Sequence, residues 1–507
     1  MQPGGAIEAA QNHAGWVSRA GRSRGEARPM EGVRGEDTGV PSLERNRSVD
    51  APNRSARKGQ VPIADDPVAQ GRPAVTGPGK RRRTTDRLTR RRFLQAAGVA
   101  GATVTFPAIN LARVADTPLR HLVLLMRENR SFDHYFGHFP GADGLPSDAP
   151  VTAAVVDCVS DPPHNAAALQ SLAGGTPYQG SALSVFTERQ IASAWALARR
   201  FTLCDRYFAS VLSPTFSNRL FSIAGSAAGF RDNPRRIDAA LLPRPNLVDR
   251  LDAAGLDWAC YLARVPDTGG YNPVAFYPER ASDPRANRSF NEFLADAASG
   301  HLPAVSWVIP QDPLTEHPPT PPQWGQRFAD LTVHAVAAGP GWRQCAVILN
   351  YDESGGFYDH VTPPPGYGFR VPCTVVSPYA KPGHVSHANY DHASVLALVE
   401  RTFRLAPLTG RDAAADPLTD CFDFNHRTSA PITFRPLQQV TGCGVPPDWA
   451  ADLLALPLPE RVVPPAGDGT GHPDLTVALT VGLGTVGAAA LGAAAVALRR
   501  RSRRDAT

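Results

Sequence analysis

Polar residues with side chains suited to phosphate and metal chemistry occur in four separate runs in the middle of the chain. Glu128 and Asn129 stand together in the first run, His317 in the second, and Asp352 and Glu353 in the third. Carboxylate and amide oxygens are ligands for hard or borderline divalent cations, and imidazoles hold phosphate oxygens or transfer protons. The other imidazoles of the third and fourth runs are His360, His384, His387 and His392. One run alone is weak evidence, but four runs gathered at one place would hold a cation and a phosphate together.

Each polar run directly follows a short apolar segment that we expect to be a β-strand. The expected strands are 121–126, 304–309, 345–351 and 372–377, and helical patterns occur at 188–200, 329–338 and 392–403. This alternation predicts an α/β fold with a mostly parallel sheet flanked by helices. Ligands of open α/β sheets bind outside the carboxyl ends of the strands, so the four runs are expected to meet at one edge.

Some of these polar residues also have ordinary structural interpretations. Asp359-His360 taken alone is compatible with a surface turn, and Asp391 directly precedes a helical pattern, where it would serve equally well as an N-cap. Thr215 follows Pro214 and is by itself a common turn residue. The residue types therefore predict a site without assigning a role to every member.

Three longer motifs resemble the bacterial phospholipase C and acid phosphatase family. They are L-M-R-E-N-R-S-F-D-H-Y-F-G at 125–137, Y-D-E-S-G-G-F-Y-D-H-V at 351–361 and N-Y-D-H-A-S-V-L at 389–396. The resemblance extends over residues 118 to 425, roughly. It implies an alkaline-phosphatase-like α/β core, one divalent metal ion whose identity stays open, and hydrolysis of a phosphoester.

The resemblance also assigns roles to individual residues. It implies that Glu128 and Asn129 bind the metal ion, that Asp352 and Glu353 complete its shell, and that Thr215 is the nucleophile. A hydroxyl is a poor nucleophile at neutral pH, and metal coordination would convert it to an alkoxide. The histidines that would hold the phosphate oxygens, one of them also protonating the leaving alcohol, are His164, His317, His360 and His392.

The substrate class follows from the resemblance less firmly than the chemistry. The familiar family substrate is phosphatidylcholine, cleaved through a covalent phosphothreonine, and a phosphomonoesterase acting on small extracellular phosphates is the main alternative. At 172–180 the chain reads L-A-G-G-T-P-Y-Q-G, where many relatives carry a stretch similar to W-x-G-G-K-M-D-G-F, which leaves the head group open. A sulfatase is disfavoured because no C-x-P-x-R or S-x-P-x-R signature occurs, and the presence of Thr215, Asn129 and Asp352 disfavours a non-catalytic binding protein.

The two ends of the chain predict export and membrane attachment. Residues 1–88 have the composition of a disordered leader, or result from a start codon assigned too far upstream. Residues 89–115 begin with T-R-R-R-F-L-Q, the form of a twin-arginine export signal that is read by its translocase. An Arg-rich patch beside a short core helix is the alternative for this segment. Residues 475–498 are 24 uncharged residues, long enough for a transmembrane helix, and the five Arg of 499–507 predict a cytoplasmic tail. The catalytic domain at 116–425 and a Pro-rich cap and stalk at 426–474 would then lie outside the cell membrane.

Charge and cysteine content limit the other function classes. Residues 1–92 hold 19 Lys or Arg against 10 Asp or Glu, and the tail from Arg499 holds five Arg against one Asp. Subtracting +9 and +4 from the net charge of +5 leaves −8 on the residues between, so an acidic body argues against nucleic acid as a partner. The seven Cys include no C-x-x-C pair, which disfavours a zinc knuckle or thioredoxin motif and leaves room for one or two disulfides.

Overall fold

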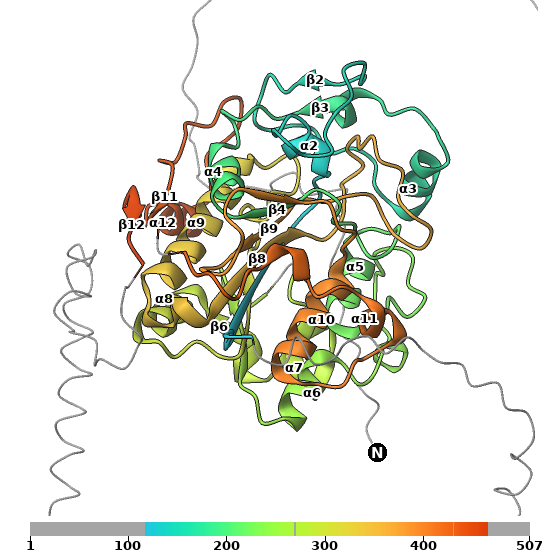
Figure 1. Cartoon of the computed structure of the whole chain (residues 1–507). Helices are drawn as coiled ribbons and strands as arrows, with labels where there is room; N and C mark the ends of the chain where they lie inside the picture. Colours follow the sequence, from blue (N-terminus) through green and yellow to red (C-terminus); the bar gives the residue numbers. More distant parts are fainter. Residues whose placement is uncertain (1–116, 268–269, 429, 465–507) are drawn as a thin grey trace, which may run out of the picture. The chain divides into compact units, whose positions relative to one another are not determined.

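An eight-stranded sheet forms the centre of the fold in this computed structural model, which describes residues 117–267, 270–428 and 430–464 (Figure 1). The strand order is β10-β4-β9-β8-β1-β7-β5-β6. The strands are β1 (His121–Arg127), β4 (Thr202–Cys204), β5 (Trp258–Leu262), β6 (Arg288–Ser289), β7 (Val305–Ile309), β8 (Cys345–Tyr351), β9 (Cys373–Val376) and β10 (His384–Ser386). All neighbouring strands pair in parallel except β9, which is antiparallel to both β4 and β8.

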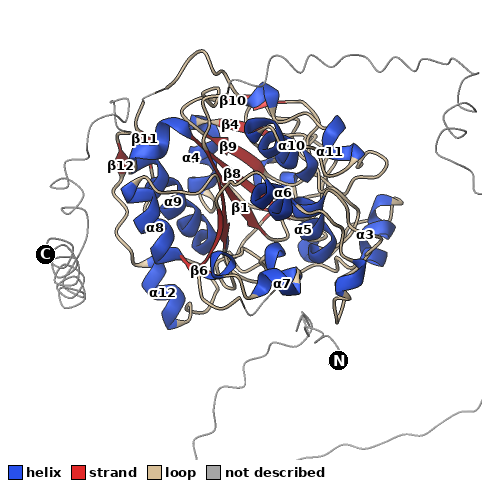
Figure 2. Ribbon diagram, turned by 90° about the horizontal axis from the view of Figure 1, so that it is seen from below, coloured by secondary structure: helices blue, strands red, loops and turns tan. Residues whose placement is uncertain are grey.

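Helices cover both faces of this sheet, as Figure 2 shows. One face carries α4 (Ala192–Arg200), α8 (Phe290–Ser299), α9 (Pro322–Ala338) and α12 (Asp448–Leu454). The other carries α5 (Thr215–Ala224), α6 (Leu247–Ala253), α7 (Pro278–Ala281), α10 (His392–Phe403) and α11 (Gly410–Ala414). The remaining elements are α2 (Phe132–Phe136), α3 (Ala166–Ala173) and two small sheets that pair β2 (Thr152–Ala153) with β3 (Ser184–Val185) and β11 (Ile432–Thr433) with β12 (Arg461–Val462).

The expected α/β class with a mainly parallel sheet is confirmed. Every residue of β5, β7 and β8 is buried, and strands covered on both faces read as continuous apolar runs, which is why their sequences were informative. Strand β8 and helix α10 have the predicted bounds, whereas α9 begins seven residues before the predicted start at 329. Helix α4 begins at Ala192 rather than at 188.

One part of the strand argument is wrong. Strand β9 runs against its neighbours, so its carboxyl end lies at the opposite edge of the sheet from those of β1, β7 and β8. The fourth polar run reaches the expected edge because β10, which the sequence did not predict, runs parallel to β4 and carries the chain back. The apolar composition of a buried strand does not record its direction, and this is the reason for the error.

Residues 430–464 contact earlier parts of the described chain. Arg327 of α9 donates to the carbonyls of Leu454 and Leu456, and a disulfide joins Cys158 to Cys443 across a sequence separation of 285. The sequence left room for one or two disulfides, and the described residues contain one. The other five cysteines are buried free thiols: Cys204, Cys260, Cys345, Cys373 and Cys421.

The predicted leader at 1–88, export signal at 89–115, transmembrane helix at 475–498 and tail at 499–507 lie outside the described residues, as does the end of the predicted stalk. Among the helices that the structure does describe, none has the length and apolar character needed to cross a membrane.

A buried carboxyl on α9 predicts a specific pH dependence of stability. Asp330 accepts a hydrogen bond from Ser193 through Oδ2, while its Oδ1 atom is buried without a hydrogen-bond partner. Burial, opposed by the Ser193 hydrogen bond, raises the pKa of Asp330 to about 7. The folded state therefore holds a proton that the unfolded chain releases near pH 4, so the contribution of this group is full below about pH 4 and is lost as the pH rises through 7.

We expect the free energy of unfolding of the natural protein to fall by up to about 4 kcal/mol relative to Asp330→Asn between pH 4 and pH 8. The amide is nearly isosteric and does not ionise, so the variant lacks this slope. Urea unfolding of both proteins at several pH values measures the difference. Asp452→Asn, at an exposed position of α12, serves as a control without the effect, and parallel profiles for the natural protein and Asp330→Asn would contradict the assignment.

Candidate active site

The four predicted metal ligands leave two neighbouring strands side by side. Strands β1 and β8 pair in parallel with Arg127 opposite Tyr351, so Glu128 and Asp352 emerge next to each other at the carboxyl edge. The Asp352 Oδ1 atom accepts hydrogen bonds from the backbone N–H groups of Asn129, at 3.3 Å, and Glu353, at 2.7 Å. These two hydrogen bonds fix the loop after β1 against the loop after β8. All four residues are buried.

Three of these four residues present a buried oxygen without a hydrogen-bond partner. The atoms are Glu128 Oε2, Asn129 Oδ1 and Glu353 Oε1. A buried acceptor left unsatisfied costs free energy, and burial also raises the pKa of Glu128, and that of Glu353 to about 8, despite nearby cations. A cation bound between these oxygens would remove both penalties. The chemistry of these donors therefore suits a divalent ion, and the carboxylates would have to move closer together to share one.

Arg219, which the sequence interpretation missed, lies between two of the predicted ligands. Its guanidinium contacts Glu128 Oε1 at 3.3 Å and Asp352 Oδ2 at 3.2 Å, and it donates to the Tyr271 carbonyl at 2.8 Å. Among the described residues, two triads of acidic and histidine residues have ligand atoms within 4.8 Å of one another. Neither triad contains Glu128, Asp352 or Glu353. The positive charge of Arg219 thus balances the negative charges of Glu128 and Asp352, whose carboxylates lie slightly apart.

Thr215 occupies the first turn of α5, one helical turn before Arg219. Residues four apart share a helix face, so Thr215 lies on the face that Arg219 turns toward Glu128 and Asp352. The Asn218 side chain donates to the carbonyls of Ser213, at 2.7 Å, and Val211, and so fixes the loop that enters the helix. The Phe216 N–H donates to Asn233 Oδ1 at 2.9 Å, and the other N–H groups of a helix start favour a bound anion such as phosphate. Thr215 is therefore the first residue of a helix, and its role as nucleophile stays a prediction.

His164 and His317 lie together beside the predicted ligands. His164 Nε2 is 3.0 Å from Asn129 Nδ2 and 3.7 Å from Glu353 Oε1, and the His164 and His317 ring centroids are 5.7 Å apart. Burial lowers the pKa of His164, but Glu353 and Asp161 outweigh it and raise the value to about 10. The Glu353 and Asp161 carboxylates thus favour the protonated form of His164.

Asp161, His164 and His317 form one of the two triads of the described residues whose ligand atoms lie within 4.8 Å of one another. The other triad is Asp133, Asp359 and His360.

The structure gives His392 and His360 other partners. His392 donates through Nε2 to the Asp352 carbonyl at 2.9 Å and accepts through Nδ1 from the Tyr207 hydroxyl at 3.1 Å, and burial lowers its pKa. It is therefore a neutral ring that positions the Asp352 backbone. His360 pairs with Asp133 at 2.7 Å and with Arg370, in a separate network. Asp391 is the N-cap of α10, which was one of the two roles that the sequence allowed for it.

Comparison with known proteins identifies the family. The model of the Phosphoesterase family matches residues 119–406, which is more than half of the chain. The chain belongs to the Phosphoesterase family. It is a hydrolase that acts on phosphoester bonds.

Several relatives with curated names are phospholipases C. Phospholipase C B of Mycobacterium tuberculosis (strain ATCC 25618 / H37Rv) is 31% identical and covers 67% of this chain and 86% of its own length. Hemolytic phospholipase C of Pseudomonas aeruginosa is 29% identical over 67% of this chain and 62% of its length. A solved protein of the alkaline phosphatase superfamily from Vibrio parahaemolyticus aligns over 59% of this chain and 70% of its own, with 9% identity and a TM-score of 0.32, too low to support an argument.

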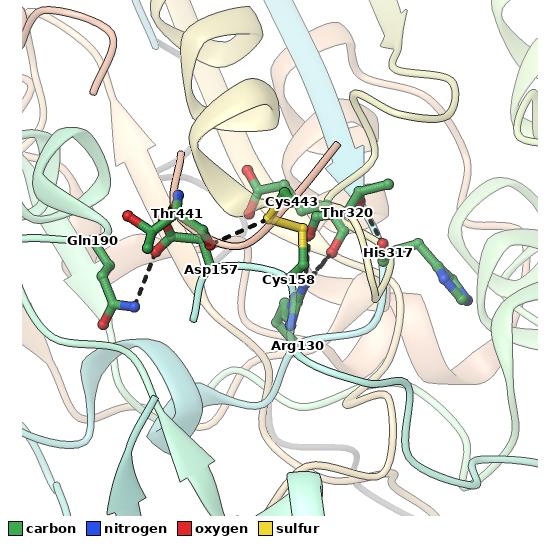
Figure 3. The surroundings of a disulfide bond; sticks show 9 residues. Arg130, Asp157, Cys158, Gln190, His317, Thr320, Thr441 and Cys443 are labelled. Carbon is green, nitrogen blue, oxygen red and sulfur yellow. Dashed lines mark hydrogen bonds between the residues drawn. A yellow bond between two sulfur atoms is a disulfide. The ribbon is translucent and has the colours of Figure 1, made fainter. Parts of the chain in front are cut away.

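Two arginines of the phosphoesterase hold the His317 loop in place. Arg130 donates to the Glu316 carbonyl at 2.9 and 2.6 Å, and Arg127 pairs with Glu316 Oε1 at 2.7 Å. Glu316 has a φ of 71°, in the left-handed region, and these contacts hold it there. Figure 3 shows Arg130 and His317 in the surroundings of the Cys158–Cys443 disulfide. The sequence could have indicated that these two arginines lie near the site, because they flank the Glu128-Asn129 pair.

Proposed function

We propose that this phosphoesterase hydrolyses the phosphodiester bond of phospholipids in the manner of a phospholipase C, with Thr215 as nucleophile. The observation that carries the proposal is the position of Arg219. It contacts two predicted metal ligands and lies one helical turn from Thr215 on α5, which supports a place for the hydroxyl beside the ligand oxygens. The names of the relatives support the substrate class.

The residues divide the reaction into two steps. The Thr215 hydroxyl attacks phosphorus and the bond from phosphorus to the glycerol oxygen breaks. We assign to His317 the transfer of a proton to the leaving alcohol, and the proton released by Thr215 restores the protonated histidine. Water then cleaves the phosphothreonine and restores the hydroxyl. His164 and the remaining N–H groups at the start of α5 hold phosphate oxygens in both steps. A divalent ion held by Glu128, Asn129, Asp352 and Glu353 would lower the pKa of the hydroxyl and balance phosphoryl charge.

We further propose an alkaline-phosphatase-like core, export by the twin-arginine route, and a single C-terminal helix that leaves the catalytic domain outside the cell membrane. The eight-stranded, mainly parallel sheet supports the first point. The T-R-R-R-F-L-Q run and the 24 uncharged residues before a basic tail support the other two. The Cys158–Cys443 disulfide is consistent with export, because such bonds persist in oxidising compartments.

Turnover of two soluble esters by the detergent-purified full chain tests the proposal. We expect p-nitrophenylphosphorylcholine, a diester, to be cleaved faster than p-nitrophenyl phosphate, a monoester. Chelation should abolish both activities, and divalent ions should restore them. Cleavage of the monoester alone would identify a phosphatase, and cleavage of neither would refute the assignment.

A further inference from the structure

Two exposed apolar side chains stand on loops that the disulfide joins. Val155 is 90% exposed and Val445 is 91% exposed, more than any other large apolar side chain of the described residues. Cys158 lies three residues after Val155, and Cys443 lies two residues before Val445. We call residues 151–160 and 436–447 together the stapled tip. Single exposed valines are common on protein surfaces, and here two stand on loops that are covalently joined.

The stapled tip is almost free of charge. Residues 436–447 contain no charged side chain, and residues 151–160 contain only Asp157. Asp157 is buried, where it accepts hydrogen bonds from Gln190 Nε2 at 3.0 Å and the Thr441 N–H at 2.7 Å (Figure 3). The charged side chains nearest to it in sequence are the exposed Asp161, Arg435 and Asp448, which border the two segments. The tip itself therefore offers apolar groups.

The two loops of the tip are joined by several contacts, which keep Val155 and Val445 exposed to solvent. The Asp157 N–H donates to the Thr441 carbonyl at 3.1 Å, and the disulfide follows one residue later on the first loop. Val156 packs against Gly442, where an added Cβ would lie 3.0 Å from Val156 Cγ1. Holding two apolar side chains outward in this way gives no benefit to the isolated domain in water.

The first loop of the tip continues directly into the active site. It leads through Pro162 and Pro163 to His164, which lies beside Asn129 and Glu353. The Pro163 carbonyl lies so close to Gly356 that a Cβ there would be 2.6 Å away, which places this loop against the turn after Glu353. The tip thus belongs to the same edge of the molecule as the catalytic groups.

We propose that the stapled tip docks on an uncharged phospholipid surface, inserting Val155 and Val445 between the head groups. This inference rests on the proposed function, because a phospholipid diester is presented at such a surface. Apolar side chains gain free energy on entering the interface, and the absence of charge suits a zwitterionic bilayer. Docking here would bring the loop that carries His164 toward the phosphate of a lipid.

A paired substitution separates docking from chemistry. We expect Val155→Ser with Val445→Ser to lower the turnover of phosphatidylcholine in vesicles by about fivefold or more, since two apolar anchors are lost, and to leave turnover of p-nitrophenylphosphorylcholine unchanged. Leu241→Ser, at a 57% exposed position outside the tip, is the matched control and should change neither rate. Equal loss on both substrates, or no loss on vesicles, would overturn the proposal.

A second measurement reports docking without turnover. Val445→Trp in the full chain adds an indole at the tip, and vesicles of phosphatidylcholine with brominated acyl chains should quench it at any salt concentration. The indole added by Leu241→Trp should stay unquenched. Absence of quenching at the tip, or quenching that needs anionic lipid and disappears in salt, would overturn the inference. If the natural protein does not cleave the soluble diester, the proposed function fails instead, whatever the quenching shows.

Discussion

Thr215→Ala is expected to lower the turnover of p-nitrophenylphosphorylcholine by at least about a thousandfold, because removing a covalent nucleophile leaves only binding and electrostatic stabilisation. The loss should appear in kcat, since the groups proposed to hold the phosphate, His164 and the start of α5, remain in place. Steady-state kinetics measures the effect, and circular dichroism with a urea unfolding curve shows whether the variant keeps its fold.

Two variants sharpen the interpretation of this result. Thr215→Ser keeps a hydroxyl at the same position and should retain turnover within about tenfold of the natural protein. Ser222→Ala removes a hydroxyl from the same helix, one that donates to the Arg219 carbonyl at 2.7 Å, and should have little effect. Turnover by Thr215→Ala within tenfold of the natural rate would eliminate the phosphothreonine mechanism.

The part of the site that the sequence predicted best is the set built on neighbouring strands. Glu128 and Asp352 each follow a buried apolar strand, and parallel pairing of two such strands places the residues after them together. That inference needs only the strand positions and the shared direction of β1 and β8. It did not extend to β9, because the direction of a strand depends on the connection that precedes it and not on its own residues.

Roles that depend on side-chain partners were less accessible. The motif around His392 shows that an imidazole is present, but only the fold shows that both ring nitrogens are taken by Tyr207 and the Asp352 carbonyl. In the same way, the pairing of Cys158 with Cys443 joins positions far apart in the chain, and no spacing rule selects it. The position of Arg219 near the site could have been predicted, since it lies four positions after Thr215 and residues with this spacing share one face of a helix.

Arg219→Met is expected to destabilise the chelator-treated protein by about 3–5 kcal/mol, because it leaves two buried carboxylates without a counter-charge. The guanidinium is 1% exposed and contacts Glu128, Asp352 and the Tyr271 carbonyl, so water cannot replace it. Arg219→Lys keeps the charge but cannot make all three contacts, and should lose less. Urea unfolding measures both variants. Arg280→Met, which removes a half-buried arginine from Asp249 and Asp252 nearer the surface, should cost only about 1 kcal/mol.

The same experiment with excess divalent ion separates the role of the metal from that of the arginine. If Glu128 and Asp352 are metal ligands, a bound ion supplies the positive charge that Arg219→Met removes, so adding the ion should stabilise this variant more than the natural protein. An equal gain for both proteins would mean that the ion does not bind at these carboxylates. A variant as stable as the natural protein in chelator would mean that the two carboxyls are already neutral, and that the charge balance assigned to Arg219 is wrong.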